Sequence, residues 1–400
     1  MSKITKLSSS VLIYYYFFIK DVFGEDLRIL YVSSIICVLS VLVYCFQQGS
    51  IELTNVPFGV WNNLIMVVYA LLTGVFVSYN YFATISGCVT YAAFSTVCIS
   101  ICYISAEEGS LEWLLKVLIS LAVVCAVYTL FRGYEWRGYG RTLSETNNPH
   151  LFAAVMYLGI FSVGFIRRNK ERTASIASAA FIALFYYSII ECGSRKYMLA
   201  GSCLVLIWMV VSIKEVLRNS DILEKIILFV GCAVFVALAL YLFQRVFYQS
   251  NIYVRLNEMD DPGNQHRILY YKEAWEIFLK HPLFGGGYDQ FKYLSGAGGY
   301  AHSTYAEAIA DFGFLGCMIY FPPIIYASGQ ALYRAFIDKR DYASMLLAAF
   351  CVAELFLGAG QIFFMEFEHF LAWMILFFYL RDAPVLREVP DQKWKYIRSS

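Results

Sequence analysis

The chain has 400 residues, of which 60% are hydrophobic and only 15% are charged. Soluble domains carry about 25% charged residues, so this chain has too little polar surface for a water-soluble fold, and the lipid bilayer must be its main solvent. A formal net charge of +1 offers no basic surface for nucleic acid, and no nucleic-acid partner is expected.

The apolar windows have the length of membrane-spanning helices. They run for roughly 18–24 residues, whereas the strands of a membrane barrel need only about 10. About twelve windows follow one another along the chain: 4–19, 28–46, 58–79, 81–104, 112–131, 149–166, 174–191, 196–214, 224–245, 304–332, 342–360 and 362–380. The first is short and rich in tyrosine, so whether it crosses the membrane stays open. The sequence predicts an all-α polytopic membrane protein that forms a single integral membrane domain over residues 1–400.

Basic residues between the spans set the orientation. The densest basic loop is RRNKER at 167–172, and further lysines and arginines lie near 214–225, near 334–340 and in the tail 381–400. With about twelve spans these segments all fall on one side, which the positive-inside rule assigns to the cytoplasm. The tail 381–400 is therefore predicted to be cytoplasmic, and the long polar segment 246–303 to be an extracytoplasmic loop.

The predicted loop contains one amphipathic helix. Asp261 followed by Pro262 is a helix-start signal, and His281 followed by Pro282 and three glycines ends the helix. Apolar residues recur between them at helical spacing: Ile268, Tyr271, Trp275 and Phe278. Such a helix either lies on the outer leaflet and caps a cavity or is a plain packing helix, and periodicity alone favours neither. The following SGAGGY, 295–300, is expected to be a movable connection.

Arginines are frequent on the predicted outer side, where the positive-inside rule disfavours them. Either they bind an anionic ligand, since guanidinium groups pair bidentately with phosphate oxygens, or they anchor in lipid headgroups. Ionisable residues also fall in the last two predicted spans, and no role is assigned to them: Glu354, Glu366, Glu368 and His369. No metal-ligand spacing and no nucleotide-binding glycine loop occurs, so no metal and no other cofactor is expected.

Four stretches carry a resemblance to a known superfamily. They are TNNPHLFAA at 146–154, SRKYMLAG at 194–201, HRILYYKEAWEIFLKHPLFGGGYDQF at 266–291 and AHSTYAEAIADFGFLG at 301–316. In order, spacing and predicted side of the membrane, they resemble the motifs of bacterial O-antigen ligases and O-antigen or capsule polymerases, which are membrane glycosyltransferases of the GT-C type. Two positions depart from the pattern, because Ser303 and His150 stand where the family has asparagine.

The resemblance implies roles for individual residues. Arg195 and Arg267 would bind the pyrophosphate of a polyprenyl-pyrophosphate-linked donor, and His302 would be the catalytic histidine near the acceptor. Two arginines can stabilise the negative charge of the leaving group without a metal ion, and a neutral histidine can accept the proton of an attacking hydroxyl. Further candidates for substrate binding are Lys196, Arg141, His150, His266 and Tyr305.

The predicted function is that of a metal-independent polysaccharide polymerase. It transfers a glycan from polyprenyl (undecaprenyl) pyrophosphate to the hydroxyl of an acceptor lipid-linked repeat unit, outside the bacterial cytoplasmic membrane, for O-antigen, capsule or exopolysaccharide synthesis. The alternatives are an O-antigen ligase, whose acceptor is lipid A-core, and a lipid-linked oligosaccharide flippase, which predicts internal repeats and charged mid-membrane residues. Expected partners are the lipid-linked donor, the acceptor glycan and the bilayer, with a chain-length regulator and a flippase of the same pathway as further candidates.

Overall fold

The computed structural model describes residues 2–19, 27–48, 56–107, 111–132, 135–137, 141–143, 149–166, 172–219, 262–296, 298–337 and 342–382. Within these ranges the regular elements are helices, as predicted, apart from one hairpin of two short antiparallel strands, β1 (Glu135–Arg137) and β2 (Arg141–Leu143). Proline opens several helices, because its fixed φ suits the first turn and its missing N–H is not needed there. Pro57 precedes α4, and Pro149 and Pro262 begin α7 and α12.

The helices in chain order are α1 (Ser2–Tyr14), η1 (Tyr15–Ile19), α3 (Leu27–Gln48), α4 (Phe58–Val77), α5 (Tyr81–Glu107), α6 (Glu112–Arg132), α7 (Pro149–Ile166), α8 (Arg172–Glu191), α9 (Arg195–Asn219), α12 (Pro262–Lys280), α13 (Phe291–Leu294), α14 (Thr304–Ile337), α15 (Tyr342–Leu357), η4 (Phe363–Met365) and α16 (Phe367–Asp382).

Five of these helices are long and apolar enough to cross a membrane. They are α3, α4, α5, α6 and α14, and they coincide with the predicted spans 28–46, 58–79, 81–104, 112–131 and 304–332. Three shorter apolar helices, α7, α8 and α15, occupy the predicted spans 149–166, 174–191 and 342–360. Helices α1 and α9 occupy the predicted spans 4–19 and 196–214 without belonging to either group. These apolar helices are those of a multi-pass membrane protein.

The last predicted span differs in the structure. The window 362–380 predicts one continuous helix, but α16 begins only at Phe367, after a turn at 358–362 and the short helix η4. Hydropathy does not separate these residues from the helix, because Ile362, Phe363 and Phe364 are themselves apolar and buried. The predicted span 224–245 and the segment 246–261 lie outside the described residues.

Helix α12 is present as predicted, and it does not pack through the apolar stripe that the periodicity identified. Ile268, Tyr271 and Trp275 are 59%, 40% and 52% exposed. The buried positions are instead Ala274 and Ile277, which belong to a small apolar cluster with residues of α13 and α14. The small Ala274 allows α12 to approach α14 closely, and the larger apolar side chains remain on the outer surface of the helix.

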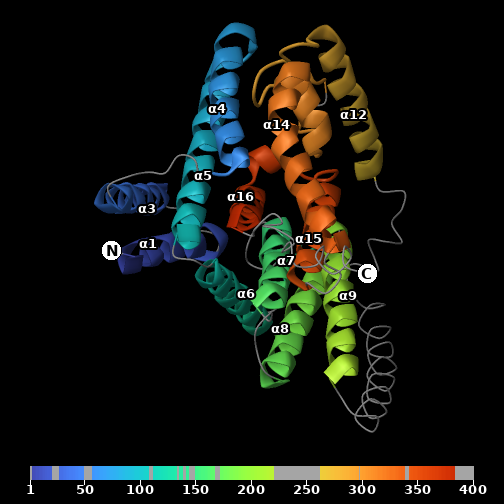
Figure 1. Ribbon diagram of the computed structural model, residues 1–400. Helices are drawn as coiled ribbons and strands as arrows, with labels where there is room; N and C mark the ends of the chain where they lie inside the picture. The colour runs from blue at the N-terminus through green and yellow to red at the C-terminus, as the bar shows by residue number, and fades with distance from the viewer. Residues whose placement is uncertain are drawn as a thin grey trace, which may run out of the picture.

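Helix α16 lies in the middle of the molecule, and α14 stands above it toward one side (Figure 1). Helix α12 lies along the upper part of α14, α4 contacts α14 from the other side, and α16 lies between α5 and α14. Helices α7, α8 and α9 form the lower part of the molecule, and α9 packs against α15. The start of α9 and the end of α15 are thereby brought near the first turns of α14.

Helix α14 is interrupted near its start. Gly313 has φ 62° and ψ −165°, which is not a helical conformation. In a membrane, the backbone groups freed by such a break must find other partners. The loop that follows α12 supplies them through four hydrogen bonds of 2.8–3.0 Å: Gly286 N to Ala310 O, Gly287 N to Asp311 O, Phe314 N to Pro282 O and Leu315 N to Leu283 O.

Two glycines allow the loop to enter this break. Gly285 has φ 70°, and a Cβ atom there would collide with the backbone carbonyl group of Asp311. A Cβ atom on Gly313 would collide with the amide nitrogen of Gly285. Both φ values are also costly for any residue with a side chain. The glycine run therefore docks the loop into α14, besides following the end of α12 as predicted.

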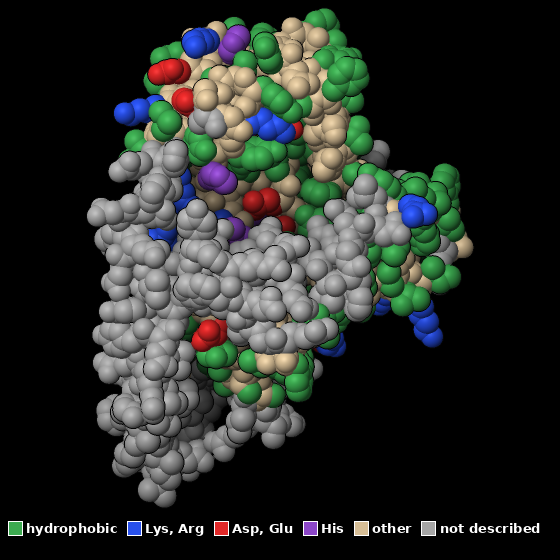
Figure 2. Space-filling model, turned by 180° about the vertical axis from the view of Figure 1, so that it is seen from behind, with side chains coloured by type: hydrophobic (Ala, Val, Ile, Leu, Met, Phe, Trp, Pro, Cys, Tyr) green, Lys and Arg blue, Asp and Glu red, His purple; other side chains and the backbone are tan. Residues whose placement is uncertain are grey.

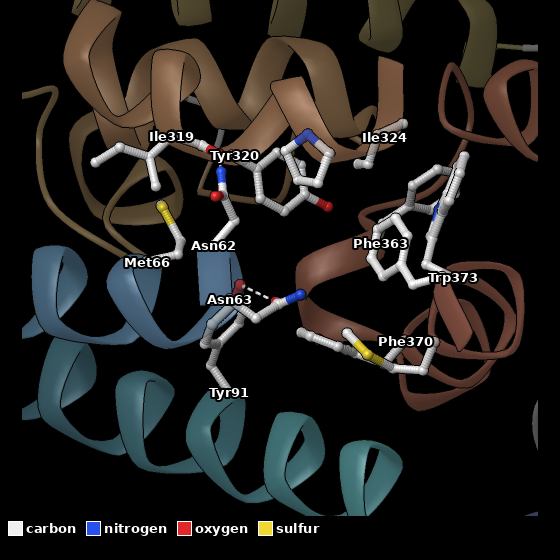
Figure 3. Close-up of a pocket in the computed structure, with 13 residues that line it drawn as sticks. Asn62, Asn63, Met66, Tyr91, Ile319, Tyr320, Ile324, Phe363, Phe370 and Trp373 are labelled. Carbon is white, nitrogen blue, oxygen red and sulfur yellow. Dashed lines mark hydrogen bonds between the residues drawn. The ribbon is translucent and has the colours of Figure 1, made fainter. Parts of the chain in front are cut away.

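Asn62 of α4 closes a second gap in α14. Pro323 lies inside the helix and removes the amide that would bond to the carbonyl of Ile319. Asn62 Nδ2 donates to that carbonyl at 2.7 Å. Figure 3 shows the neighbouring Asn63 beside Tyr91 of α5, whose hydroxyl donates to Asn63 Oδ1 at 2.7 Å. Amide side chains thus tie α4 to α14 and to α5.

Replacing either glycine of the docked loop tests this arrangement. We expect Gly285→Ala and Gly313→Ala each to lower the free energy of unfolding by about 2–5 kcal/mol, because each adds a positive-φ penalty and a backbone collision. Thermal unfolding of the detergent-solubilised protein measures the change. Gly329→Ala is the matched control, since a Cβ atom meets nothing there, and it should be neutral or stabilising by up to ~1 kcal/mol. Wild-type stability of both loop variants would contradict the docking.

Candidate functional site

The turn 358–361, between α15 and η4, receives side chains from two separate helices. Lys196, in the first turn of α9, donates from Nζ to the carbonyl of Gly360 at 3.0 Å. Tyr271, in the middle of α12, donates from its hydroxyl to the carbonyl of Ala359 at 3.0 Å. The turn therefore joins the start of α9 to α12, which are far apart in the sequence.

The start of α14 is fixed to the same turn. The amide of Thr304 lies 2.8 Å from the carbonyl of Gly358 and 2.7 Å from that of Gln361, and the Thr304 hydroxyl donates to Gln361 O at 2.6 Å. The Tyr305 hydroxyl donates to the carbonyl of Leu355, in the last turn of α15, at 2.6 Å. Three of the sequence motifs, on α9, α12 and α14, thus meet at one turn.

Arg195 and His150 lie on the α9 side of this meeting point. Arg195 is the first residue of α9 and is partly buried. The preceding residue, Ser194, is buried, and its hydroxyl oxygen lies 3.4 Å from Nδ1 of His150 in the first turn of α7. The structure therefore brings His150 and Arg195 to the same place, next to Lys196.

Arg267 and His302 lie on the other two elements. Arg267 is exposed and stands one helical turn before Tyr271, so the two occupy the same face of α12. His302 is exposed, has φ 53°, and lies two residues before the anchored Thr304. Its ring centroid is 6.1 Å from that of Tyr270. Figure 2, which views the molecule from behind, shows histidine, basic and acidic side chains gathered on the upper part of the described surface.

Two further candidates are placed only by their backbone. Arg141 begins β2, opposite Arg137 of β1, and His266 lies in the first turns of α12. The side chains of Arg141 and His266 lie outside the described residues. Within the described part of the chain, no group of three or more His, Cys, Asp or Glu side chains is arranged to hold a metal ion.

Sequence reasoning missed the turn 358–361 and the anchoring role of Tyr271. The signal available was LGAGQ at 357–361, which places two glycines and an amide between two apolar segments. Glycine and polar residues between apolar windows favour a turn. Nothing in that pattern, however, says which helices contact its carbonyls, because the contacting residues lie at least 54 positions away, from Thr304 to Gly358.

Two buried carboxylates in α14 hold the loop that precedes His302. Asp311 is fully buried and accepts from the amides of 289–291 at 2.8, 3.2 and 2.8 Å, which satisfies the N-terminus of the short helix α13. Glu307, also fully buried, accepts from the amide of Ala301 at 2.6 Å. The backbone on both sides of 295–300, and with it the approach to His302, is thus bonded to α14.

An ion pair lies in the same loop. Lys292 Nζ is 2.7 Å from Asp289 Oδ2 and 3.1 Å from the Tyr300 hydroxyl, and the Lys292 and Asp289 side chains are 22% and 13% exposed. Burial raises the pKa of Asp289, and the bond from Lys292 opposes that shift. Burial acts to lower the pKa of Lys292, but the hydrogen bonds to Asp289 and Tyr300 outweigh it and raise that pKa. The ammonium thus stabilises a carboxylate that burial disfavours.

A comparison with known protein families finds a match that covers the helices α9 and α12 and the start of α14. Residues 172–321 match the family model described as O-antigen ligase. This part of the chain is similar to the O-antigen ligase family. The O-antigen ligase match begins with α8 and ends inside α14, so it contains Arg195, Arg267 and His302. Proteins of this family are glycosyltransferase-like enzymes of polysaccharide biosynthesis that transfer lipid-linked glycans. A comparison with curated proteins found no match.

Removing Lys292 tests whether its ammonium group stabilises the ionised carboxylate of Asp289. We expect Lys292→Met to lower the free energy of unfolding by about 2–4 kcal/mol near pH 8, because a largely buried carboxylate loses its counter-ion. Without Lys292 the folded-state pKa of Asp289 rises further above its unfolded value. Asp289 of the folded variant then takes up a proton as the pH falls. The loss in the free energy of unfolding, relative to wild type, therefore becomes smaller at lower pH. Thermal unfolding between pH 5 and pH 8 measures this change.

The double variant Asp289→Asn with Lys292→Met is the control for this pH dependence. It removes both charges, so its stability relative to wild type should vary less with pH than that of Lys292→Met. A deficit of equal size at pH 5 and pH 8 in the single variant would show that lost packing, and not the unpaired carboxylate, is responsible.

Proposed function

We propose that the protein is a polysaccharide polymerase of the outer face of the bacterial cytoplasmic membrane. It transfers a glycan from polyprenyl pyrophosphate to the hydroxyl of an acceptor lipid-linked repeat unit. Arg195 and Arg267 bind the donor pyrophosphate, and His302 is the catalytic base. In this topology the loop 246–303 is extracytoplasmic and the tail 381–400 is cytoplasmic.

The convergence of α9, α12 and α14 on the turn 358–361 is the observation that carries this proposal. It supports a site in which Lys196 and the adjacent Arg195 approach from one side, and the α12 face with Arg267 and Tyr271 from another. The anchored Thr304 of α14 follows the exposed His302 by two residues. Cationic groups next to an exposed imidazole suit a reaction in which an anionic leaving group departs while a hydroxyl loses a proton.

The proposed reaction is a single displacement. The oxygen of the acceptor hydroxyl forms a bond to the anomeric carbon of the donor glycan. The bond from that carbon to the pyrophosphate oxygen breaks, and its electron pair leaves with the pyrophosphate. His302 takes the hydroxyl proton, while Arg195 and Arg267 stabilise the charge on the leaving group. Guanidinium groups suit this role because they stay protonated and pair bidentately with phosphate oxygens. The step as written needs no metal ion.

An O-antigen ligase is the second candidate, because the matching family model is described by that activity. It uses the same donor and the same residues, and only the acceptor differs: lipid A-core replaces the lipid-linked repeat unit. The other partners we propose, a chain-length regulator and a flippase of the same pathway, would act with a polymerase.

Substitution of the three principal residues tests the proposed chemistry. We expect Arg195→Ala, Arg267→Ala and His302→Ala each to lower the transfer rate by about 100-fold or more. The rate is measured with purified protein and a polyprenyl-pyrophosphate-linked repeat unit, with and without EDTA. His281→Ala is the matched control, since His281 is exposed at the end of α12 and should leave the rate unchanged. Full activity of all three site variants would exclude these roles, and loss of activity in EDTA would exclude metal independence.

The products of that reaction separate the two candidates. A ladder of longer lipid-linked glycans from the repeat unit alone supports the polymerase. Transfer that occurs only after lipid A-core is added supports the ligase.

Labelling of single introduced cysteines tests the orientation. Lys280→Cys, exposed at the end of α12, should react with a membrane-impermeant thiol reagent in intact cells whose outer barrier is open, because the loop is extracytoplasmic in this proposal. Lys116→Cys is the control, because Lys116 is 57% exposed near the start of α6, on the proposed cytoplasmic side, and should react only after lysis. The reverse pattern would overturn the topology and the site with it.

A further inference from the structure

A buried polar network lies directly beneath the turn 358–361. Glu354 of α15 and His369 of α16 are 1% and 2% exposed, and His369 Nδ1 lies 2.8 Å from Glu354 Oε2. His369 Nε2 lies 2.8 Å from Gln361 Oε1 and 3.4 Å from Glu366 Oε2. Tyr197 of α9 donates from its hydroxyl to the same Gln361 Oε1 at 2.7 Å.

The ring of His369 has an oxygen partner at each nitrogen. Glu354 Oε2 lies at Nδ1 and Gln361 Oε1 at Nε2, with Glu366 Oε2 farther away on the Nε2 side. The side-chain oxygen of Gln361 is therefore held by two partners, Tyr197 and His369. A buried polar network of this kind keeps its geometry only while its hydrogen-bond partners stay in place.

Gln361 connects this buried network to the turn 358–361 and to the start of α14. Its side chain belongs to the buried network, while its backbone carbonyl accepts from both the amide and the hydroxyl of Thr304, at 2.7 and 2.6 Å. The Thr304 hydroxyl in turn accepts from the amide of Phe363 at 2.9 Å, and the Phe363 ring lies 4.3 Å from the His369 ring. One residue thus connects the buried ring of His369 to the backbone two residues beyond His302.

We propose that Gln361, held by His369 and Tyr197, is a positioning residue for the glycan-transfer reaction. It fixes the turn 358–361 and, through Thr304, the placement of His302 relative to Lys196 and Arg195. The inference rests on the proposed function, because it assigns a role within that reaction. Gln361 itself touches no reacting atom; it acts through the geometry of the groups that do. A displacement of the reacting groups by about 1 Å can cost a factor of about 100 in rate.

Two tyrosines give a matched test. Tyr197→Phe removes the hydroxyl that donates to Gln361. Tyr157→Phe removes a hydroxyl that is equally buried, on a ring 5.8 Å from that of Tyr197, and that has no hydrogen-bond partner among the described residues. We expect Tyr197→Phe to lower kcat about tenfold or more while the KM for the donor changes less than about threefold. Tyr157→Phe should keep both constants.

Two substitutions of Gln361 test the same point through its acceptor oxygen. Gln361→Leu keeps the size of the side chain and loses the oxygen that accepts from Tyr197 and His369. It should lower kcat at least as much as Tyr197→Phe. Gln361→Glu keeps acceptor oxygens and should restore most of the lost rate. Thermal unfolding is measured for each variant, so that a change in kcat is read only from protein that is folded at the assay temperature.

The outcomes separate this inference from the proposed function. If the wild-type protein transfers no glycan from a polyprenyl-pyrophosphate donor, the proposed function fails and the inference fails with it. If the wild type is active and Tyr197→Phe and Gln361→Leu keep its kcat, the proposed function stands and the inference is overturned. Equal losses in Tyr197→Phe and Tyr157→Phe would also overturn it, because the effect would then come from packing. A selective loss of kcat, with rescue by Gln361→Glu, supports it.

Discussion

The contact between Gly285 and Gly313 is the constraint on which the upper part of the molecule depends. Here two backbone segments meet closely enough that neither could carry a side chain. The reason is burial, because the backbone groups released by the break in α14 lie inside the protein and have no water to bond to. The loop after α12 bonds to them instead, with four backbone hydrogen bonds. A break that would otherwise be costly thus becomes the attachment point of the loop.

This attachment supplies one of the two anchors that flank His302. The docked loop brings the amides of 289–291 onto Asp311, and Glu307 holds Ala301 immediately before His302. On the other side, Thr304 is fixed to the turn 358–361, which also receives Lys196 and Tyr271. His302 therefore stands between two rigid anchors while its own side chain stays exposed. The role that we propose for His302 needs that combination of fixed backbone and open access.

The sequence predicted helices more reliably than it predicted their contacts. Pro262 and the segment after Lys280 gave the bounds of α12, because proline constrains the backbone locally. Which face of α12 packs against other helices was not predicted, since periodicity finds an apolar stripe but not what covers it, and Ile268 and Trp275 of that stripe are exposed. Glu354 and His369 were visible as ionisable residues in apolar segments. Their pairing was not, because they belong to different helices and α16 starts later than hydropathy suggests.

The sequence by itself determined that this is a membrane protein, where most of its helices lie, and which residues are candidates for the site. These depend on composition, on local backbone preferences and on short motifs, all of which act over a few neighbouring residues. The tertiary structure alone decided that the glycine run docks into α14, that the turn 358–361 joins α9, α12 and α14, and that His369 and Glu354 pair beneath it. Those features depend on close approach between residues distant in the chain, and spacing along a sequence does not encode such distances.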